Sequence, residues 1–368
     1  MTNNLNFKNR PTFIIAELSG NHHQNYREAE KLVRAAAAAG ADAIKSQTYT
    51  ADTLTLKSDR EWFRVGGQDQ PDAWRGRTLY DLYTEAHTPW DWLPKLKKLA
   101  ESLGLTFFTS VFDETAVNFN EQMGVELYKI AAYESVHLPL LKKVAATSKP
   151  VIISLGFGDR EDARLAIETL RAGGAPEIAA LHCVTTYADA PVYQNSNLAT
   201  IADIAKRFGV TAGFSDNTGG IIVPIVTAIA GGAKIVEKHL TLDRKLAGPD
   251  ARFSIEPDEF SEMVRLIRAH ENGDRTVINQ VATTAEVAAM MGQVHYGWVN
   301  EQEKENQFFR PSIWIKKDIA AGEILTPENI RIARPHSGLA PKHWPAVLGK
   351  KAARDIEAAT PLAWGLIT

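Results

Sequence analysis

The sequence predicts an α/β fold: a (β/α)8 TIM barrel followed by a small C-terminal β-rich domain. Short β-branched or aromatic runs alternate with amphipathic, Ala- and Leu-rich segments eight times before about residue 272. Alternation of this kind is typical of parallel strands joined by helices, and eight units favour a closed barrel over an open sheet. From residue 308 the alternation gives way to short elements that Gly and Pro punctuate densely.

The eight expected strands share a short apolar or β-branched run. They are TFIIAEL at 12–18, AIKSQTY at 43–49, TFFTSVF at 106–112, LYKIAA at 127–132, PVIISL at 150–155, IAALHCV at 178–184, TAGFSDN at 211–217 and IVEKHLTL at 235–242. Helix-period sequence follows these runs. The first such segment begins at Tyr26 and ends at Gly40, a residue type that often caps helices at the C-terminal end.

The chain divides into three expected parts. Residues 1–272 form the barrel, the polar and poorly periodic residues 273–307 form a linker or arm, and residues 308–368 form the small domain. About 60 residues are too few for a large independent core, so we expect this last part to dock on a barrel, its own or a partner's. A long aromatic-containing insert at 51–92 is interpreted as a lid or rim over the site.

Composition excludes several classes of protein. A net charge of −3 over 368 residues carries no electrostatic signature for nucleic acid or anionic lipid. The N-terminal residues lack the apolar core of a signal peptide, and no apolar stretch reaches the roughly 18 residues of a membrane span. We therefore expect a cytoplasmic protein.

Cys183 is the single cysteine, which rules out an internal disulfide. Its apolar run favours a buried structural thiol over a nucleophile.

The C-terminal ends of barrel strands carry the active site in enzymes of this fold. The expected strands place two lysines, several hydroxyls, carboxylates, amides and a histidine there: Glu17, Asn21, Lys45, Gln47, Ser110, Lys129, Glu134, Ser154, Tyr187, Ser215, Asn217, Glu237 and His239. Lysines with hydroxyls suit a phosphate or carboxylate, and a His beside oxygen donors suits a divalent metal such as Mn²⁺. Simply solvated lysines are the alternative interpretation.

Several ordered blocks of the sequence resemble the sialic acid synthase family. They are FIIAELSGNH, GADAIKSQTYTADTLTL, YKIAAYE, GFSDN, IVEKHLTLDRKLAGPDARFSIEPDEF and RIARPHSGLAPKHW…LGKKAARDI, the last resembling that family's antifreeze-like (SAF) domain. Within the family, LYDLYTEAHTPWDW and GPDARFSIEPDEF look more like the pseudaminic acid synthase branch. The resemblance implies a synthase that condenses phosphoenolpyruvate with an N-acetylated amino-sugar aldehyde, releases phosphate and forms a nine-carbon 2-keto acid.

The resemblance also implies roles for individual residues. Catalysis would fall to Glu17, Lys45, Lys129, Tyr187 and Asp250, and substrate binding to Asn21, Gln47, Ser110, Glu134, Ser154, Ser215 and Arg334. His239 and Asn217 would hold a divalent metal, Mn²⁺ or Mg²⁺. Arg334 would reach across a homodimer with swapped C-terminal domains to the N-acyl group of the sugar in the partner's site.

Some motif positions depart from the family pattern and cluster at the site. Asn217 stands where the family has a second metal-binding histidine, and Ala132 stands where it has a serine near the phosphate. An Asn oxygen can ligate Mn²⁺ or Mg²⁺ but is a poorer donor than imidazole for late transition metals. We therefore expect an active synthase with a shifted metal site.

Three alternatives stay open at this point. The sugar could belong to the neuraminic or legionaminic branch. The barrel could instead carry a Schiff-base aldolase that uses Lys45 or Lys129, with no metal requirement. The changes at Asn217 and Ala132 also fit a non-catalytic relative that binds sugar acids.

Overall fold

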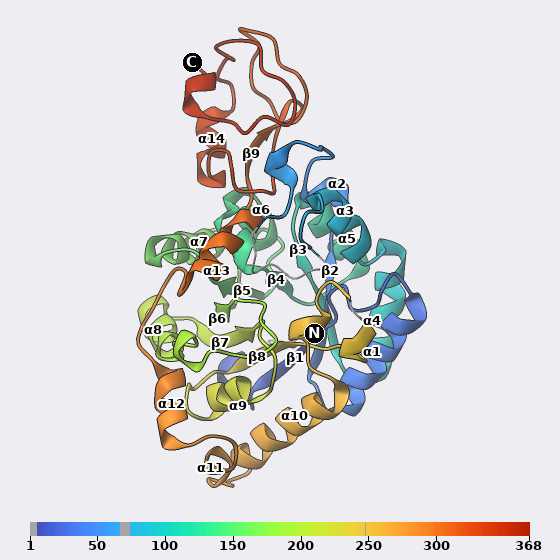
Figure 1. Ribbon diagram of the computed structural model, residues 1–368, viewed down its shortest axis with the longest axis vertical. Helices are drawn as coiled ribbons and strands as arrows, with labels where there is room; N and C mark the ends of the chain where they lie inside the picture. The colour runs from blue at the N-terminus through green and yellow to red at the C-terminus, as the bar shows by residue number, and fades with distance from the viewer. Residues whose placement is uncertain (1–5, 67–73, 247) are drawn as a thin grey trace.

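The first two thirds of the chain close into a barrel (Figure 1). The computed structural model describes residues 6–66, 74–246 and 248–368. Eight parallel strands pair in sequence order, and β8 pairs with β1 to complete the ring. The strands are β1 (Phe13–Glu17), β2 (Ala43–Thr48), β3 (Thr106–Val111), β4 (Tyr128–Ile130), β5 (Val151–Leu155), β6 (Ile178–Val184), β7 (Thr211–Asp216) and β8 (Ile235–His239). The predicted TIM barrel is confirmed.

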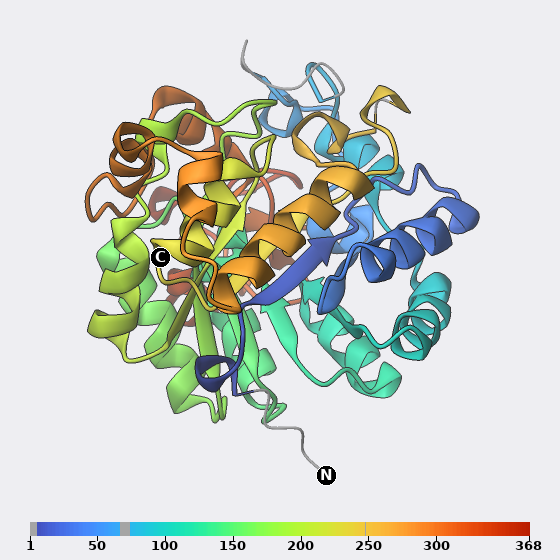
Figure 2. The same cartoon turned by 90° about the horizontal axis from the view of Figure 1, so that it is seen from below.

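Helices connect the strands and lie around the outside of the barrel (Figure 2). The helices of the barrel are α1 (Tyr26–Ala38), α2 (Ala51–Leu54), α3 (Leu79–Ala86), α4 (Leu93–Ser102), α5 (Glu114–Met123), α6 (Leu138–Ala145), α7 (Arg160–Ala172), α8 (Ala199–Phe208), α9 (Ile222–Ile229) and α10 (Pro257–Glu271). Side-chain caps define several of their starts. Asn25, for example, accepts from the backbone N–H of Arg27 at 3.0 Å at the head of α1.

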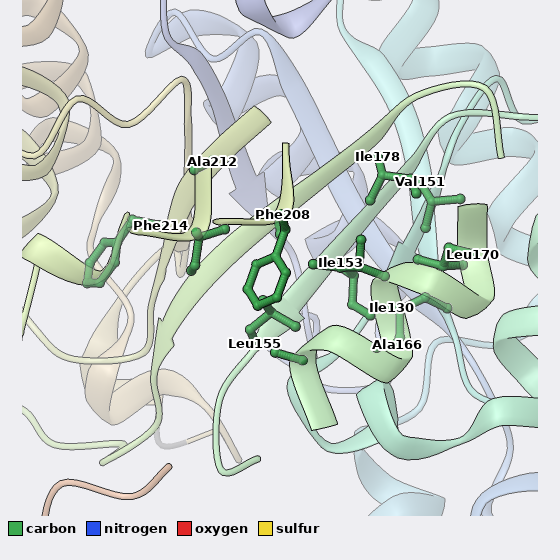
Figure 3. Packing of buried hydrophobic residues seen from close by; sticks show 14 of the residues in the cluster. Ile130, Val151, Ile153, Leu155, Ala166, Leu170, Ile178, Phe208, Ala212 and Phe214 are labelled. Atoms are coloured by element: carbon green, nitrogen blue, oxygen red, sulfur yellow. The ribbon is translucent and has the colours of Figure 1, made fainter. Parts of the chain in front are cut away.

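Successive side chains of each strand point to opposite sides, so the barrel strands contribute to two apolar layers. One set of side chains fills the barrel interior: Phe7, Phe13, Ile15, Ala43, Phe108, Leu127, Ile152, Ala179, Leu181 and Ile235. The alternate residues face the helices. Figure 3 shows Ile130 and Ile153 of neighbouring strands against Ala166 and Leu170 of α7. The interior at the N-terminal ends of the strands is therefore a packed core. A site can form only at the C-terminal ends of the strands, called here the upper end.

The segment after the barrel, expected to be a linker or arm, has secondary structure of its own. It contains three short helices, α11 (Val277–Val281), α12 (Thr284–Met291) and α13 (Glu301–Asn306). A capping box explains the start of α12, because Thr283 and Glu286 each accept from the other's backbone N–H. Figure 1 shows this arm running from α11 at one end of the molecule, past α12 and α13, to the C-terminal domain at the other.

The C-terminal domain is small and built around an antiparallel pair of strands, β9 (Ser312–Ile315) and β10 (Ile330–Ala333), with a short helix, α14 (Trp344–Val347). Its own core gathers around Ile313, Leu325 and Val347. The domain also packs on the barrel insert, where the Phe63 and Trp314 ring centroids lie 4.6 Å apart. The insert thus joins this domain to the barrel.

Candidate active site

Polar side chains replace the apolar ones at the upper end of the barrel interior. Strand β1 illustrates the change, because Phe13 and Ile15 belong to the inner core and Glu17, two residues further on, points into the same interior. Register places the equivalent residues of other strands beside it: Glu17 pairs with Lys45, Ser110 with Lys129, and Cys183 with Ser215, which pairs with Glu237. Period-two alternation therefore turns the ends of these seven strands into one layer of mostly polar side chains.

The two predicted lysines lie at the centre of this layer and are both buried. Lys45 Nζ forms an ion pair with Glu17 Oε2 and donates to Ser110 Oγ at 2.9 Å. Lys129 Nζ donates to Ser154 Oγ at 2.7 Å. Glu237 Oε1 lies between them, 3.5 Å from Lys45 Nζ and 3.7 Å from Lys129 Nζ. Two ammonium groups with adjacent hydroxyls form a cradle that fits a small anion.

The two carboxylates of the cradle have different protonation behaviour. Burial raises the pKa of Glu17, although Lys45 opposes that shift. Burial also disfavours the charge of Glu237, but Lys129 and Lys45 outweigh it and lower the pKa of Glu237. Paired carboxyl groups whose environments separate their pKa values divide proton transfer and charge stabilisation between them. Glu17, whose pKa is raised, is the member better suited to carry a proton.

The lysines differ as well. Burial lowers the pKa of Lys129, and the charge of Lys45 adds to that effect against the opposing charge of Glu237. Burial acts on Lys45 in the same sense, but Glu17 and Glu237 outweigh it and raise the pKa of Lys45. Lys45, next to two carboxyl groups, therefore holds its proton more firmly than Lys129 does.

A pocket opens above the polar layer and holds about 870 Å³ of space, its open mouth included. It brings together most of the residues predicted from the sequence: Lys45, Gln47, Ser110, Lys129, Ser154, Tyr187, Ser215, Asn217, His239, Asp250 and Arg334. Glu17 and Glu134 do not line it but contact Lys45 and Arg334, which do. The structure thus gathers side chains from all parts of the sequence at one mouth.

Asn21 is the exception among the predicted binding residues. Its Nδ2 donates to Leu240 O at 2.9 Å and to Ser254 Oγ at 2.9 Å, and the residue is not among those that line the pocket. The expected substrate contact is therefore not supported, because hydrogen bonds to the segment after β8 turn the side chain into the structure. The two hydrogen bonds tie Asn21 to the segment that follows β8.

Ser19 is a pocket residue that sequence reasoning missed. Its hydroxyl donates to Asp250 Oδ2, Gln47 Nε2 lies 3.3 Å from it, and its backbone N–H donates to Glu17 Oε1 at 2.9 Å. The residue has φ +47°, a left-handed backbone conformation that is costly for most residues other than glycine. Ser19 therefore joins three predicted site residues, and its place two positions after Glu17, just beyond the end of β1, was the available signal.

Two side chains at one edge of the pocket suit a divalent metal. Asn217 Nδ2 donates to Val184 O at 2.8 Å and lies 3.4 Å from Cys183 Sγ, which leaves the side-chain oxygen Oδ1 for the pocket. His239 Nδ1 is a buried atom without a hydrogen-bond partner, and burial, with nearby Lys45, lowers the pKa of His239 well below 6.5. A neutral imidazole and an amide oxygen are both competent ligands for Mn²⁺ or Mg²⁺.

The ligand set is small. Within residues 6–66, 74–246 and 248–368, no group of three or more His, Cys, Asp or Glu side chains is arranged to hold a metal ion. The residues present fit a metal that takes two protein ligands and fills its other positions with substrate or water. Cys183 is not an additional thiolate, because burial raises its pKa to about 12. The structure thus favours the structural thiol over the nucleophile.

The opposite edge of the pocket is built from Arg334 and aromatic rings. Arg334 Nη2 and Nε donate to Glu134 Oε1 at 2.7 Å and 3.0 Å, and Nη1 donates to Tyr83 OH at 3.1 Å. The guanidinium lies 4.9 Å from the ring centroid of Tyr133, within range of a cation–π interaction. Trp74 and Phe309 extend this aromatic wall, with centroids 5.4 Å apart. The insert therefore forms a rim of the site.

Arg334 lines the pocket of its own chain, and its service to the site of a partner stays a prediction. The sequence predicts that it serves the site of a partner chain, whereas here it lies in the mouth of its own barrel. Two hydrogen bonds hold the backbone there, from Arg334 N to Leu54 O at 3.0 Å and from Thr55 Oγ1 to Arg334 O at 2.8 Å. The arm makes this possible because it returns along the barrel from α11 to the mouth (Figure 1).

Among the described residues, no helix has both the length and the apolar character that crossing a membrane requires.

Comparison with known proteins agrees with this geometry. The model of the NeuB family matches residues 32–277, and that of the SAF domain matches residues 310–368. Pseudaminic acid synthase from Campylobacter jejuni is 36% identical over 97% of this chain and 96% of its own. N,N'-diacetyllegionaminic acid synthase from Legionella pneumophila is 31% identical over 96% of this chain and 93% of its own.

A solved structure with the same two-part architecture is spore coat polysaccharide biosynthesis protein SpsE from Bacillus subtilis. It superposes with a TM-score of 0.81 at 32% sequence identity and covers 98% of this chain and 96% of its own. The similarity therefore extends over the barrel, the arm and the small domain together. This chain belongs to the NeuB family and ends in a SAF domain.

Proposed function

We propose that this protein is a phosphoenolpyruvate-dependent nonulosonic acid synthase of the pseudaminic acid type. The observation that carries the proposal is the buried cradle of Lys45 and Lys129, flanked by serine hydroxyls and by two carboxyl groups with separated pKa values. Such a cradle suits a small compound that carries both a phosphate and a carboxylate. A carbohydrate with an N-acyl group would then occupy the Arg334 side of the same pocket.

In the proposed reaction a carbon–carbon bond forms between C3 of phosphoenolpyruvate and the aldehyde carbon of an open-chain amino sugar. Water adds at C2, and phosphate leaves by C–O cleavage. Lys45, Lys129, Ser110, Ser154 and Ser215 would bind phosphoenolpyruvate, and Glu17 would transfer the proton. Tyr187, Gln47, Glu134 and Asp250 would surround the sugar.

A divalent metal, Mn²⁺ or Mg²⁺, would be held by His239 and Asn217. When bound it would supply a Lewis acid next to the aldehyde oxygen. The unpartnered His239 Nδ1 and the orientation of the Asn217 amide support this assignment. We also propose that the chain divides into a barrel (1–272), an arm (273–307) and a SAF domain (308–368).

The branch is proposed on similarity of sequence. Identity is 36% to the pseudaminic acid synthase of Campylobacter jejuni and 31% to the legionaminic acid synthase of Legionella pneumophila. The decisive assay is phosphate release from phosphoenolpyruvate with Mn²⁺, comparing the diacetamido-trideoxy-altrose sugar with N-acetylmannosamine. Faster release with the first sugar supports the pseudaminic branch, and the reverse ratio supports the neuraminic one. Ligand binding without turnover under any divalent metal would instead indicate a non-catalytic relative.

A Schiff-base aldolase is the second candidate, favoured by one observation. The lowered pKa of Lys129 is a property of lysines that form imines. This reaction needs no metal and would leave a covalent adduct when a keto acid is added with borohydride. An adduct on Lys129, seen by mass spectrometry and absent from Lys129→Arg, would replace the synthase proposal.

We propose further that the protein is a cytoplasmic homodimer, since phosphoenolpyruvate is a cytoplasmic metabolite. In a swapped dimer, the SAF domain of each copy would make with the barrel of the other copy the contacts that it makes here with its own barrel. Mixing Glu17→Ala protein with Arg334→Ala protein separates the two arrangements. Activity regained after mixing supports exchange of the domains, whereas two inactive components that stay inactive indicate that each chain completes its own site.

A further inference from the structure

The last helix of the arm reaches the end of β6 and buries one face there. Glu303 and Asn306 lie on one face of α13, with 3% and 1% of their surfaces exposed. Glu303 Oε1 accepts from the backbone N–H of Thr185 at 2.7 Å and from its hydroxyl at 3.0 Å. Asn306 Nδ2 donates to Thr185 O at 2.8 Å. The polar groups of Thr185 are therefore held by residues more than a hundred positions away in the sequence.

One peptide group connects this contact to the pocket. The N–H of Thr185 belongs to the same peptide unit as the carbonyl of Val184. That carbonyl accepts from Asn217 Nδ2 at 2.8 Å and from the backbone N–H of Asn217 at 3.3 Å. A continuous path of hydrogen bonds thus runs from Glu303 through the Val184–Thr185 peptide to the Asn217 carboxamide. A carboxylate at the N–H end polarises the peptide and strengthens the acceptor at its other end.

The path has a consequence for the direction of the Asn217 amide. A carboxamide has a donor side and an acceptor side, and only the oxygen can ligate a metal. The Val184 carbonyl fixes the nitrogen on its own side, so the oxygen faces the pocket. We propose that Glu303 is a positioning residue that, through this peptide, keeps Asn217 Oδ1 turned toward the pocket. The proposal rests on the proposed function only where it concerns metal affinity.

The Glu303 carboxylate is itself fixed on both sides. Its other oxygen, Oε2, accepts from Val299 N–H at 3.0 Å, and the backbone N–H of Glu303 donates to Asn300 Oδ1 at 2.8 Å. Glutamine at this position would place an amide N–H against Val299 N–H or Thr185 N–H, so it cannot satisfy both donors. Glu303→Gln is thus a nearly isosteric change that weakens the path without emptying the space.

The first experiment reads the Asn217 side chain directly. In protein labelled with ¹⁵N at asparagine, the Asn217 side-chain amide signal is assigned by its loss in Asn217→Ala. We expect Glu303→Gln and Asn306→Ala to shift this signal and to speed its hydrogen exchange. Glu305→Gln, on the exposed side of the same helix, should leave it unchanged. An unshifted signal in Glu303→Gln would overturn the proposal, whatever reaction the protein catalyses.

The second experiment measures Mn²⁺ binding to the substrate-free protein by electron paramagnetic resonance. Loss of a residue that orients a metal ligand lowers affinity about 10-fold or more, which is the effect expected for Glu303→Gln. Equal affinity in wild type and Glu303→Gln would refute the link to the metal. Absence of Mn²⁺ binding in the wild type would refute the proposed metal site, while the amide signal still decides the positioning role.

Discussion

Arg334 in the SAF domain and Glu134 after β4 form a buried ion pair, with Nη2 and Oε1 2.7 Å apart. The two residues are 6% and 1% exposed and lie 200 positions apart in the sequence. Three aromatic rings enclose the guanidinium. This contact joins the two domains across the mouth of the site, so its loss should lower stability and, on the proposed function, sugar binding.

Removal of Arg334 alone should be strongly destabilising. Arg334→Met leaves Glu134 as an unpaired buried charge, which typically costs about 3–5 kcal/mol. The double variant Arg334→Met with Glu134→Gln has no such charge and should recover most of the free energy of unfolding. Urea unfolding of the three proteins measures this. A double variant no more stable than Arg334→Met would show that the loss comes from packing.

The metal site should respond to the residue at position 217. Asn217→His adds an imidazole ligand, so it should keep activity and shift preference toward late transition metals. Asn217→Ala removes the oxygen and should lower Mn²⁺ affinity. Calorimetric titration with Mn²⁺, Mg²⁺ and Zn²⁺ measures both changes. Identical affinities in Asn217→Ala and wild type would remove Asn217 from the ligand set.

Two substitutions of Ser19 distinguish an effect on activity from an effect on stability. Ser19→Gly and Ser19→Ala both delete the hydroxyl that contacts Asp250, and both should reduce sugar turnover to a similar degree. Glycine also relieves the left-handed backbone at φ +47°, so Ser19→Gly should be more stable than Ser19→Ala by about 1 kcal/mol. Thermal unfolding and initial rates test the pair. Full activity in either variant would show that the hydroxyl is dispensable.

His137 should make the fold sensitive to acid. Burial lowers its pKa to about 4, and its Nδ1 accepts from Leu140 N–H at 3.2 Å as the cap of α6. The unfolded chain therefore binds a proton that the folded one does not, and stability is lost as pH falls from about 6.5 toward 4. At pH 5 the resulting loss in the free energy of unfolding is about 2 kcal/mol.

His137→Asn tests that contribution, because asparagine keeps a cap acceptor but does not titrate. The difference in free energy of unfolding between pH 7.5 and pH 5 should shrink by about 2 kcal/mol. The same substitution at His343, whose ring packs on the partly exposed Trp364, is the control. An unchanged pH dependence in His137→Asn would contradict the assignment.

The barrel was predictable because each strand carries its own local signal. The run 178–184 coincides with β6, and the other seven expected strands differ from the observed ones mainly at their ends. The period of two also explains why Glu17, Lys45 and Lys129 converge, since strand ends of a closed parallel barrel must meet. Local sequence was enough for the polar layer.

Contacts between distant segments were not predictable in this way. The side-chain direction of Asn21 depends on Leu240 and Ser254, and the place of Arg334 depends on the course of the arm. The helices of the arm are short and weakly amphipathic, so their periodicity is hard to detect. The capping box of Thr283 and Glu286 and the C-terminal Gly292 were the local signals available for α12.

The apolar filling of the lower barrel has a kinetic consequence. Phe7 and Phe13 occupy that end of the interior, so compounds enter and leave by the mouth alone. A compound seated on Lys45 and Lys129 lies deeper than one beside Arg334 and Trp74. If the two substrates of the proposed reaction occupy these positions, the deeper one should bind first and the upper one second, and phosphate released at the lysines should leave only after the product above it has moved. The protein should show compulsory-order kinetics, with phosphoenolpyruvate as the leading substrate.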